Sequence, residues 1–134
     1  MDATQLKARM RAFALDVIAL VEILPRSMTT EVLGKQLLRS ATSVGANYRA
    51  ACRARSKPDF LAKMGILEEE ADECLYWMEL LRDYRRITPE RYAPLAKEAD
   101  ELLAITVASI NTARLSRTNI APGARASQAQ SVNK

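Results

Sequence analysis

The sequence predicts an all-α protein: an up-down-up-down four-helix bundle with a disordered basic C-terminal tail. Apolar residues recur at steps of three and four in four segments, which is the period of helices packed in a bundle. Two segments open with a Ser or Thr followed by Pro and an acid, the residues that start helices. The 134 residues include only 4 Gly and 5 Pro, too few for a loop-rich all-β fold. We place the bundle at residues 1–118 and the tail at residues 119–134.

The first two segments are joined at a proline. The first, residues 4–24, carries Leu6, Met10, Phe13, Val17, Leu20 and Leu24 along one seam. Pro25 ends it, because the residue before a proline is biased out of the helical region. The second begins near Thr29 or Thr30, either of which can cap a helix, and runs to about residue 54. Its seam is Leu33, Leu37, Ser40, Val44, Tyr48 and Ala51.

The last two segments have explicit start signals. The third opens with Ser56 before Pro58 and Asp59 and extends to about residue 86. Its seam is Phe60, Met64, Leu67, Ala71, Cys74, Met78 and Leu81. The fourth opens with Thr88 and Pro89 and fades near residue 117. Its seam is Tyr92, Leu95, Ala99, Leu102, Thr106, Ser109 and Ala113.

The second and third segments carry more apolar surface than one seam requires. A second face of the second segment holds Gly34, Leu38, Ala41 and Gly45. A second face of the third holds Ile66, Trp77, Leu80 and Tyr84. Apolar patches left exposed on one molecule usually mark interfaces. We therefore expect a homo-oligomer with these eight residues at the contact.

Charge is segregated along the chain. Lys and Arg number 20 and Asp and Glu 16, a net charge of +4. Residues 114–134 hold four bases and no acid, so this C-terminal stretch accounts for the excess. Residues 39–63 hold six bases against one acid, and residues 68–83 hold seven acids against one base. Such a layout can steer a polyanion to one side of a molecule or pair one subunit with the next.

The bases of the second and third segments are the candidate nucleic-acid contacts. They are Arg39, Arg49, Arg53, Arg55, Lys57 and Lys63. On a helical wheel the first three share the face opposite the seam, and guanidinium groups fit phosphates without reading sequence. The alternatives are a solvated face, or a set of partners for the acids of the third segment. The tail is either an inert solubilising end or a source of further salt-dependent affinity.

Few residues suggest catalysis. The chain has no His, which removes histidine bases, nucleophile pairs and metal ligands. We expect no enzymatic activity, cofactor, metal or small-molecule substrate; a metal enzyme built on the carboxylates of residues 68–73 is a distant alternative. Cys52 and Cys74 fit small buried hydrophobes, and Asn47 fits a structural polar residue that fixes register. No signal sequence or membrane span is evident, so we expect a cytoplasmic protein.

Four stretches resemble one protein family. They are residues 36–47 (QLLRSATSVGAN), 48–56 (YRAACRARS), 68–73 (EEEADE) and 75–81 (LYWMELL). They are similar to the four-helix bundle proteins encoded within intervening sequences of bacterial 23S rRNA genes. Leu24, Pro25 and Glu31 also fit. Much of that family carries Asn-x-Ala-Glu-Gly; here Asn47 matches, but Ala50 and Ala51 stand where glutamate and glycine are expected.

The resemblance implies a bacterial homo-oligomer, a pentameric ring or barrel, with no established enzymatic activity. A similar fold serves as the accessory protein of diversity-generating retroelements, where a basic barrel binds nucleic acid and a reverse transcriptase. Our first hypothesis is an oligomeric bundle that binds RNA, or an RNA–protein complex, through phosphates. The second is a protein–protein scaffold whose arginines pair with acids of neighbouring subunits.

Overall fold

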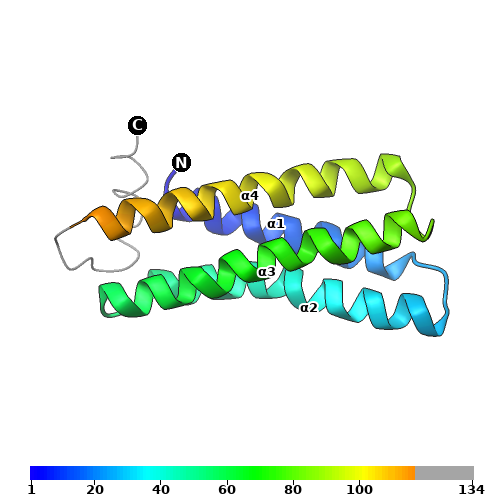
Figure 1. The fold of residues 1–134 in the computed structure, drawn as a ribbon, viewed down its shortest axis with the longest axis horizontal. Helices are drawn as coiled ribbons and strands as arrows, with labels where there is room; N and C mark the ends of the chain where they lie inside the picture. Colours follow the sequence, from blue (N-terminus) through cyan, green and yellow to red (C-terminus); the bar gives the residue numbers. More distant parts are fainter. Residues whose placement is uncertain (117–134) are drawn as a thin grey trace.

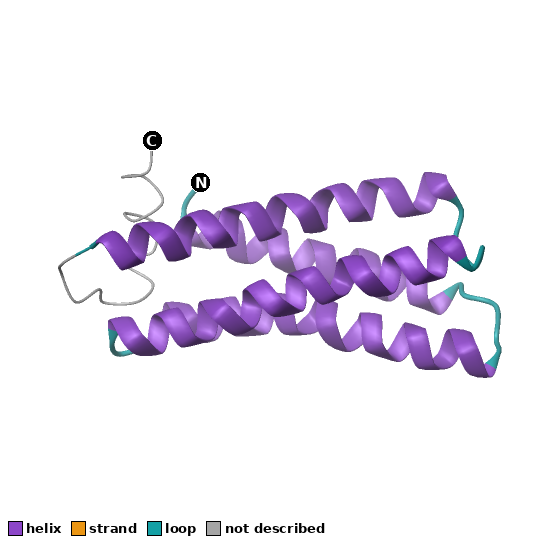
Figure 2. Ribbon diagram, viewed as in Figure 1, coloured by secondary structure: helices purple, strands orange, loops and turns teal. Residues whose placement is uncertain are grey.

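The structure, a computed structural model, describes residues 1–116 and confirms the four-helix bundle (Figure 1). Its helices are α1 (Ala3–Glu22), α2 (Met28–Cys52), α3 (Lys57–Asp83) and α4 (Pro89–Leu115). They run alternately up and down with short loops between them, so the start of α1 and the end of α4 lie at the same end (Figure 2). No strand occurs in residues 1–116. The predicted tail, residues 119–134, lies outside the described residues.

The start of α2 differs from the prediction. Ser27, not Thr29 or Thr30, is the N-cap, and its hydroxyl accepts the N–H of Thr30. Thr30 completes the capping box, because its own hydroxyl accepts the Ser27 N–H at 3.1 Å. The Thr30 hydroxyl also donates to the carbonyl of Pro25, which ties the loop to the first turn. Thr30, three residues after Ser27, was therefore mistaken for the cap that it supports.

The starts of α3 and α4 follow the prediction. The Ser56 hydroxyl accepts the Asp59 N–H, and the Thr88 hydroxyl accepts the Arg91 N–H. The end of α3 is set by Arg85, which has a positive φ of 59°. The Arg86 N–H reaches the Leu81 carbonyl and the Arg85 N–H reaches that of Arg82, the pattern of a Schellman motif.

The predicted seams form the core. Every residue of the α3 seam is buried, and so are the first five of the α1 seam, while Leu24 is half-buried. In α2 and α4 the seam residues nearest the first turn, Leu33, Tyr92 and Leu95, are only half-buried. The remaining seam residues of both helices are buried. The core is continuous and largely aliphatic.

α2 packs between α1 and α3, and α3 packs between α2 and α4. The α1–α4 side is the least closely packed of the four. There Arg9 holds the two helices together: its Nε and one Nη each donate to Glu98 at 2.7 Å, and the same Nη contacts Glu101 at 2.6 Å. The hydrogen bond with Glu98, more than any other contact, raises the pKa of Arg9.

Candidate nucleic-acid interface

Arg39 does not present a free guanidinium. It donates to Glu70 at 2.9 Å and to Glu73 at 2.6 Å, both on α3. Glu70 is only 8% exposed, so Arg39 supplies the charge that a buried carboxylate requires. Glu73 also accepts the indole N–H of Trp77 at 3.3 Å. Arg39 therefore belongs to a charge network between α2 and α3, the alternative that the sequence left open for it.

Two of the predicted lysines are also engaged within the chain. Lys57 donates to the carbonyls of Arg114 and Ser116, where α4 ends. Cations are stabilising at a helix C-terminus, so Lys57 caps α4 across the bundle end. Lys63 lies 3.3 Å from Asp59, one turn earlier on α3. The pairing of Lys63 is exposed and weak, whereas that of Lys57 joins two helices.

Arg49, Arg53 and Arg55 remain available. All three are exposed, and no ion pair to them occurs among residues 1–116. The predicted row of bases thus divides along α2. Arg39 bends toward α3 and its acids, while Arg49 lies on the side that faces α1.

Arg49 borders a groove between α1 and α2 of about 440 Å³, which we call the basic groove. Its lining residues are Lys7, Ala8, Met10, Arg11, Ala14, Thr42, Gly45, Ala46 and Arg49. Three of these nine are cations and none is an acid. Lys7 and Arg11 come from α1, one turn apart, and Arg49 comes from α2. The sequence analysis did not select Lys7 or Arg11.

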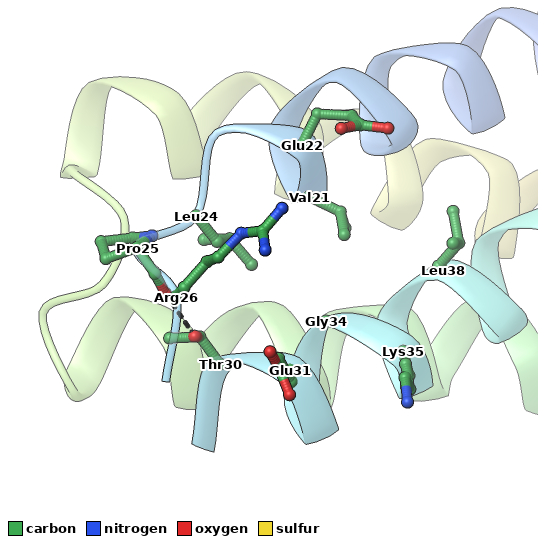
Figure 3. A pocket seen from close by; sticks show the side chains of 10 residues that line it. All are labelled: Val21, Glu22, Leu24, Pro25, Arg26, Thr30, Glu31, Gly34, Lys35 and Leu38. Carbon is green, nitrogen blue, oxygen red and sulfur yellow. Dashed lines mark hydrogen bonds between the residues drawn. The ribbon is translucent and has the colours of Figure 1, made fainter. Parts of the chain in front are cut away.

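A second groove also lies between α1 and α2, at the opposite end of these helices (Figure 3). Figure 3 shows Arg26 extending from the loop toward α1, with Glu31 and Lys35 coming from α2. Its charged lining residues are Glu22, Arg26, Glu31 and Lys35, two of each sign. A balanced set of charges gives no field that attracts a polyanion. Of these two grooves between α1 and α2, the basic groove is therefore the one with a net positive lining.

The α2 residues predicted to contact another subunit are largely used by α1. Ala41 is fully buried and Gly34 is buried, so neither has surface to offer a second copy. A Cβ on Gly34 would lie 3.4 Å from both Leu24 and Val21, and one on Gly45 would lie 3.6 Å from Met10 Cβ. Both glycines therefore face α1 and not a second molecule.

The α3 residues of the predicted interface keep their surface. Ile66 is 44% exposed and Tyr84 54%, while Trp77 and Leu80 are half-buried. Tyr76, whose ring meets that of Trp77 edge-on at 5.0 Å, is also 54% exposed. The guanidinium of Arg86 lies 4.3 Å from the Tyr84 ring centroid. These side chains form an apolar surface on the outside of α3.

The remaining candidates are structural. Asn47 is half-buried and donates to the Ser43 carbonyl at 2.8 Å, within its own helix. Tyr48 is fully buried, so it offers no stacking surface; burial, and then the neighbouring Cys52, raise its pKa. Both cysteines are free and buried, as expected. In residues 1–116 no three Cys, Asp or Glu side chains gather as metal ligands, and no helix is apolar enough to cross a bilayer.

Comparison with known proteins finds a matching family and a solved relative. The family model described as 23S rRNA-intervening sequence protein matches residues 3–108, which is most of the chain. The chain belongs to the 23S rRNA-intervening sequence protein family. This confirms the resemblance drawn from residues 24–81. A search of curated proteins finds no match.

A solved relative has the same bundle. It is a protein of unknown function from the S23 ribosomal protein family of Bacteroides thetaiotaomicron, 35% identical to this chain with a TM-score of 0.77. The similarity covers 83% of this chain and 99% of the relative. Membership in the 23S rRNA-intervening sequence protein family thus fixes the fold and leaves the activity to be argued from the surface.

Proposed function

We propose that this 23S rRNA-intervening sequence protein is a non-enzymatic bundle that binds RNA through phosphate contacts. The observation that carries the proposal is the basic groove, in which Lys7, Arg11 and Arg49 come together without an acid among the lining residues. Arg53 and Arg55 extend this basic surface past the end of α2. Cations that have no ion pair within residues 1–116 attract the phosphate backbone and contribute affinity that falls with salt.

The test is a salt titration of RNA binding. Fluorescein-labelled RNA is titrated with the full chain between 50 and 200 mM salt and followed by anisotropy. The variant Arg49→Ala/Arg53→Ala removes two phosphate contacts, so the slope of log K against log salt should fall by about 1.4 for single strands. The control, Arg91→Ala/Lys97→Ala, removes the same charge from exposed positions on α4. An unchanged slope in the α2 variant, or no salt-dependent binding at all, would overturn the proposal.

We further propose that the protein acts as a homo-oligomer joined through the outer face of α3. The support is the apolar surface around Ile66 and Tyr84, because exposed patches of this kind mark contacts between proteins. Light scattering should give a multiple of 14.9 kDa for the full chain. Ile66→Lys should lower that mass, and Val32→Lys, at a more exposed position on α2, should leave it unchanged. A monomeric wild type at micromolar concentration would refute the assembly.

The second candidate function is a scaffold without RNA binding. It is favoured by the acids on α3 that have no ion pair in residues 1–116, among them Glu69 and Asp72, which Arg53 and Arg55 of a neighbouring copy could contact. Under this function, Arg49→Ala/Arg53→Ala would weaken the oligomer and RNA would not bind at any salt concentration. The two experiments together separate the two functions.

A further inference from the structure

The basic groove has an apolar floor, which a phosphate backbone alone does not require. Met10, Ala14, Gly45 and Ala46 lie between the cations of α1 and Arg49 of α2. The hydroxyl of Thr42 donates to the Leu38 carbonyl at 2.8 Å, so it is already satisfied within α2. An apolar lining beside cations can accept the face of a base while the cations contact the neighbouring phosphates. The volume, about 440 Å³, is within the range of small-ligand sites.

Gly45 keeps this floor open without being required by helix packing. A Cβ at position 45 would meet Met10 Cβ, C and O at 3.6, 3.8 and 3.9 Å, all ordinary contact distances. Alanine would therefore fit against α1, and it forms helices better than glycine does. A Cβ at Gly34 would lie slightly closer to its neighbours, 3.4 Å from both Leu24 and Val21. Packing against α1 therefore does not by itself require glycine at position 45.

We propose that the basic groove seats one unpaired nucleotide of an RNA, with its base on the floor at Gly45 and its flanking phosphates on Lys7, Arg11 and Arg49. This rests on the proposed RNA-binding function and narrows it to single-stranded segments. A duplex keeps the faces of its bases stacked inside and presents phosphates, sugars and base edges, so no base face could cover the apolar floor. The groove of Figure 3 cannot serve in the same way, because Glu22 and Glu31 would repel the phosphates.

The experiment compares a labelled single-stranded RNA with the same sequence in a duplex. Gly45→Leu fills the floor and leaves every cation in place. It should weaken single-strand binding several-fold, because the leucine side chain excludes the base from the apolar floor, with the salt slope and the duplex affinity unchanged. Gly65→Leu is the matched control, because a Cβ at Gly65 on α3 meets nothing within 4 Å. If Gly45→Leu loses its helical circular dichroism signal, Gly45→Ala is used in its place. Gly45→Ala should show a smaller loss of affinity and a melting temperature higher than that of the wild type by about 2–4 °C.

The possible outcomes distinguish the nucleotide site from the proposed RNA-binding function on which it rests. The nucleotide site would be overturned, with RNA binding left intact, if salt-dependent binding were tighter for the duplex. The same would hold if a folded Gly45 variant bound single-stranded RNA as tightly as the wild type. An absence of salt-dependent binding to either RNA would overturn both. Weaker single-strand binding in Gly45→Leu and not in Gly65→Leu would establish the site.

Discussion

Arg9 and Arg11 are two residues apart on α1 and should respond in opposite ways to the same substitution. Arg9 faces α4, where it makes a bidentate pair with Glu98 and a further contact with Glu101. Arg11 lines the basic groove on the α2 side and has no ion pair in residues 1–116. Each change to alanine removes one positive charge from the same helix. Net charge is therefore matched, and only the direction of the side chain differs.

The size of the Arg9 effect follows from its exposure. The side chains of Arg9 and Glu98 are 26% and 28% exposed, so solvent screens the pair in part. Exposed pairs contribute about 0.2–1 kcal/mol each, and bidentate geometry favours the upper end. We expect Arg9→Ala to lower the free energy of unfolding by about 1 kcal/mol, and Arg11→Ala to change it by less than about 0.5 kcal/mol. The effects on RNA binding should be the opposite: Arg11→Ala should reduce the salt slope of binding by about 0.7, and Arg9→Ala should leave it unchanged.

The assay is urea unfolding followed by circular dichroism, paired with the anisotropy titration on the same samples. A double-mutant cycle of Arg9→Ala with Glu98→Ala should give a coupling energy that is most, but not all, of the effect of Arg9→Ala, because Arg9 also contacts Glu101, and this coupling should be reduced in 1 M salt. The reasoning is refuted by equal unfolding energies of the two single variants. It is equally refuted by an Arg9 variant that loses as much salt dependence as the Arg11 variant.

Three further predictions concern stability and reactivity. Arg39→Ala should lower the urea midpoint, because Glu70 is left buried without its partner, whereas Arg53→Ala should not; equal midpoints would contradict the α2–α3 network. Arg85→Gly should raise the free energy of unfolding by about 0.5–1 kcal/mol, since glycine adopts a positive φ without strain; a lower value in urea would count against this. Burial raises the pKa of the Cys74 thiol to about 12, so at pH 8 a disulfide reagent should react only after unfolding, and rapid labelling of native protein would disprove it.

The fold could be predicted because its signals are local. The apolar spacing alone identifies each seam, and the Ser or Thr before Pro and an acid places the starts of α3 and α4. The start of α2 was misplaced because Ser27, Thr29 and Thr30 all have capping side chains. Which hydroxyl caps depends on the backbone of the loop from Pro25, and sequence spacing does not define that conformation.

The candidate site could be predicted only in part, because it depends on how the helices lie relative to one another. A helical wheel describes one helix alone. Arg39 and Arg49 share one face of α2 on the wheel, yet Arg39 pairs with Glu70 on α3 and Arg49 lines the groove between α1 and α2. Lys7 and Arg11 were missed because each is an ordinary exposed base until α1 is placed beside α2. Their spacing of one turn, on a face adjoining the α1 seam, was the available signal.

The charge excess of residues 39–63 therefore overstates the binding surface of α2. On the side toward α3 the acids of that helix neutralise Arg39, while on the side toward α1 nothing in the groove lining opposes Arg49. The basic groove and the exposed apolar face belong to different pairs of helices, because α1 and α3 lie diagonally across the bundle. An assembly joined through α3 would leave each basic groove open, so variants at Ile66 should change the mass of the oligomer without changing the salt slope of RNA binding by one subunit. RNA binding through the basic groove and oligomerisation through α3 can therefore be tested independently, because they depend on different residues.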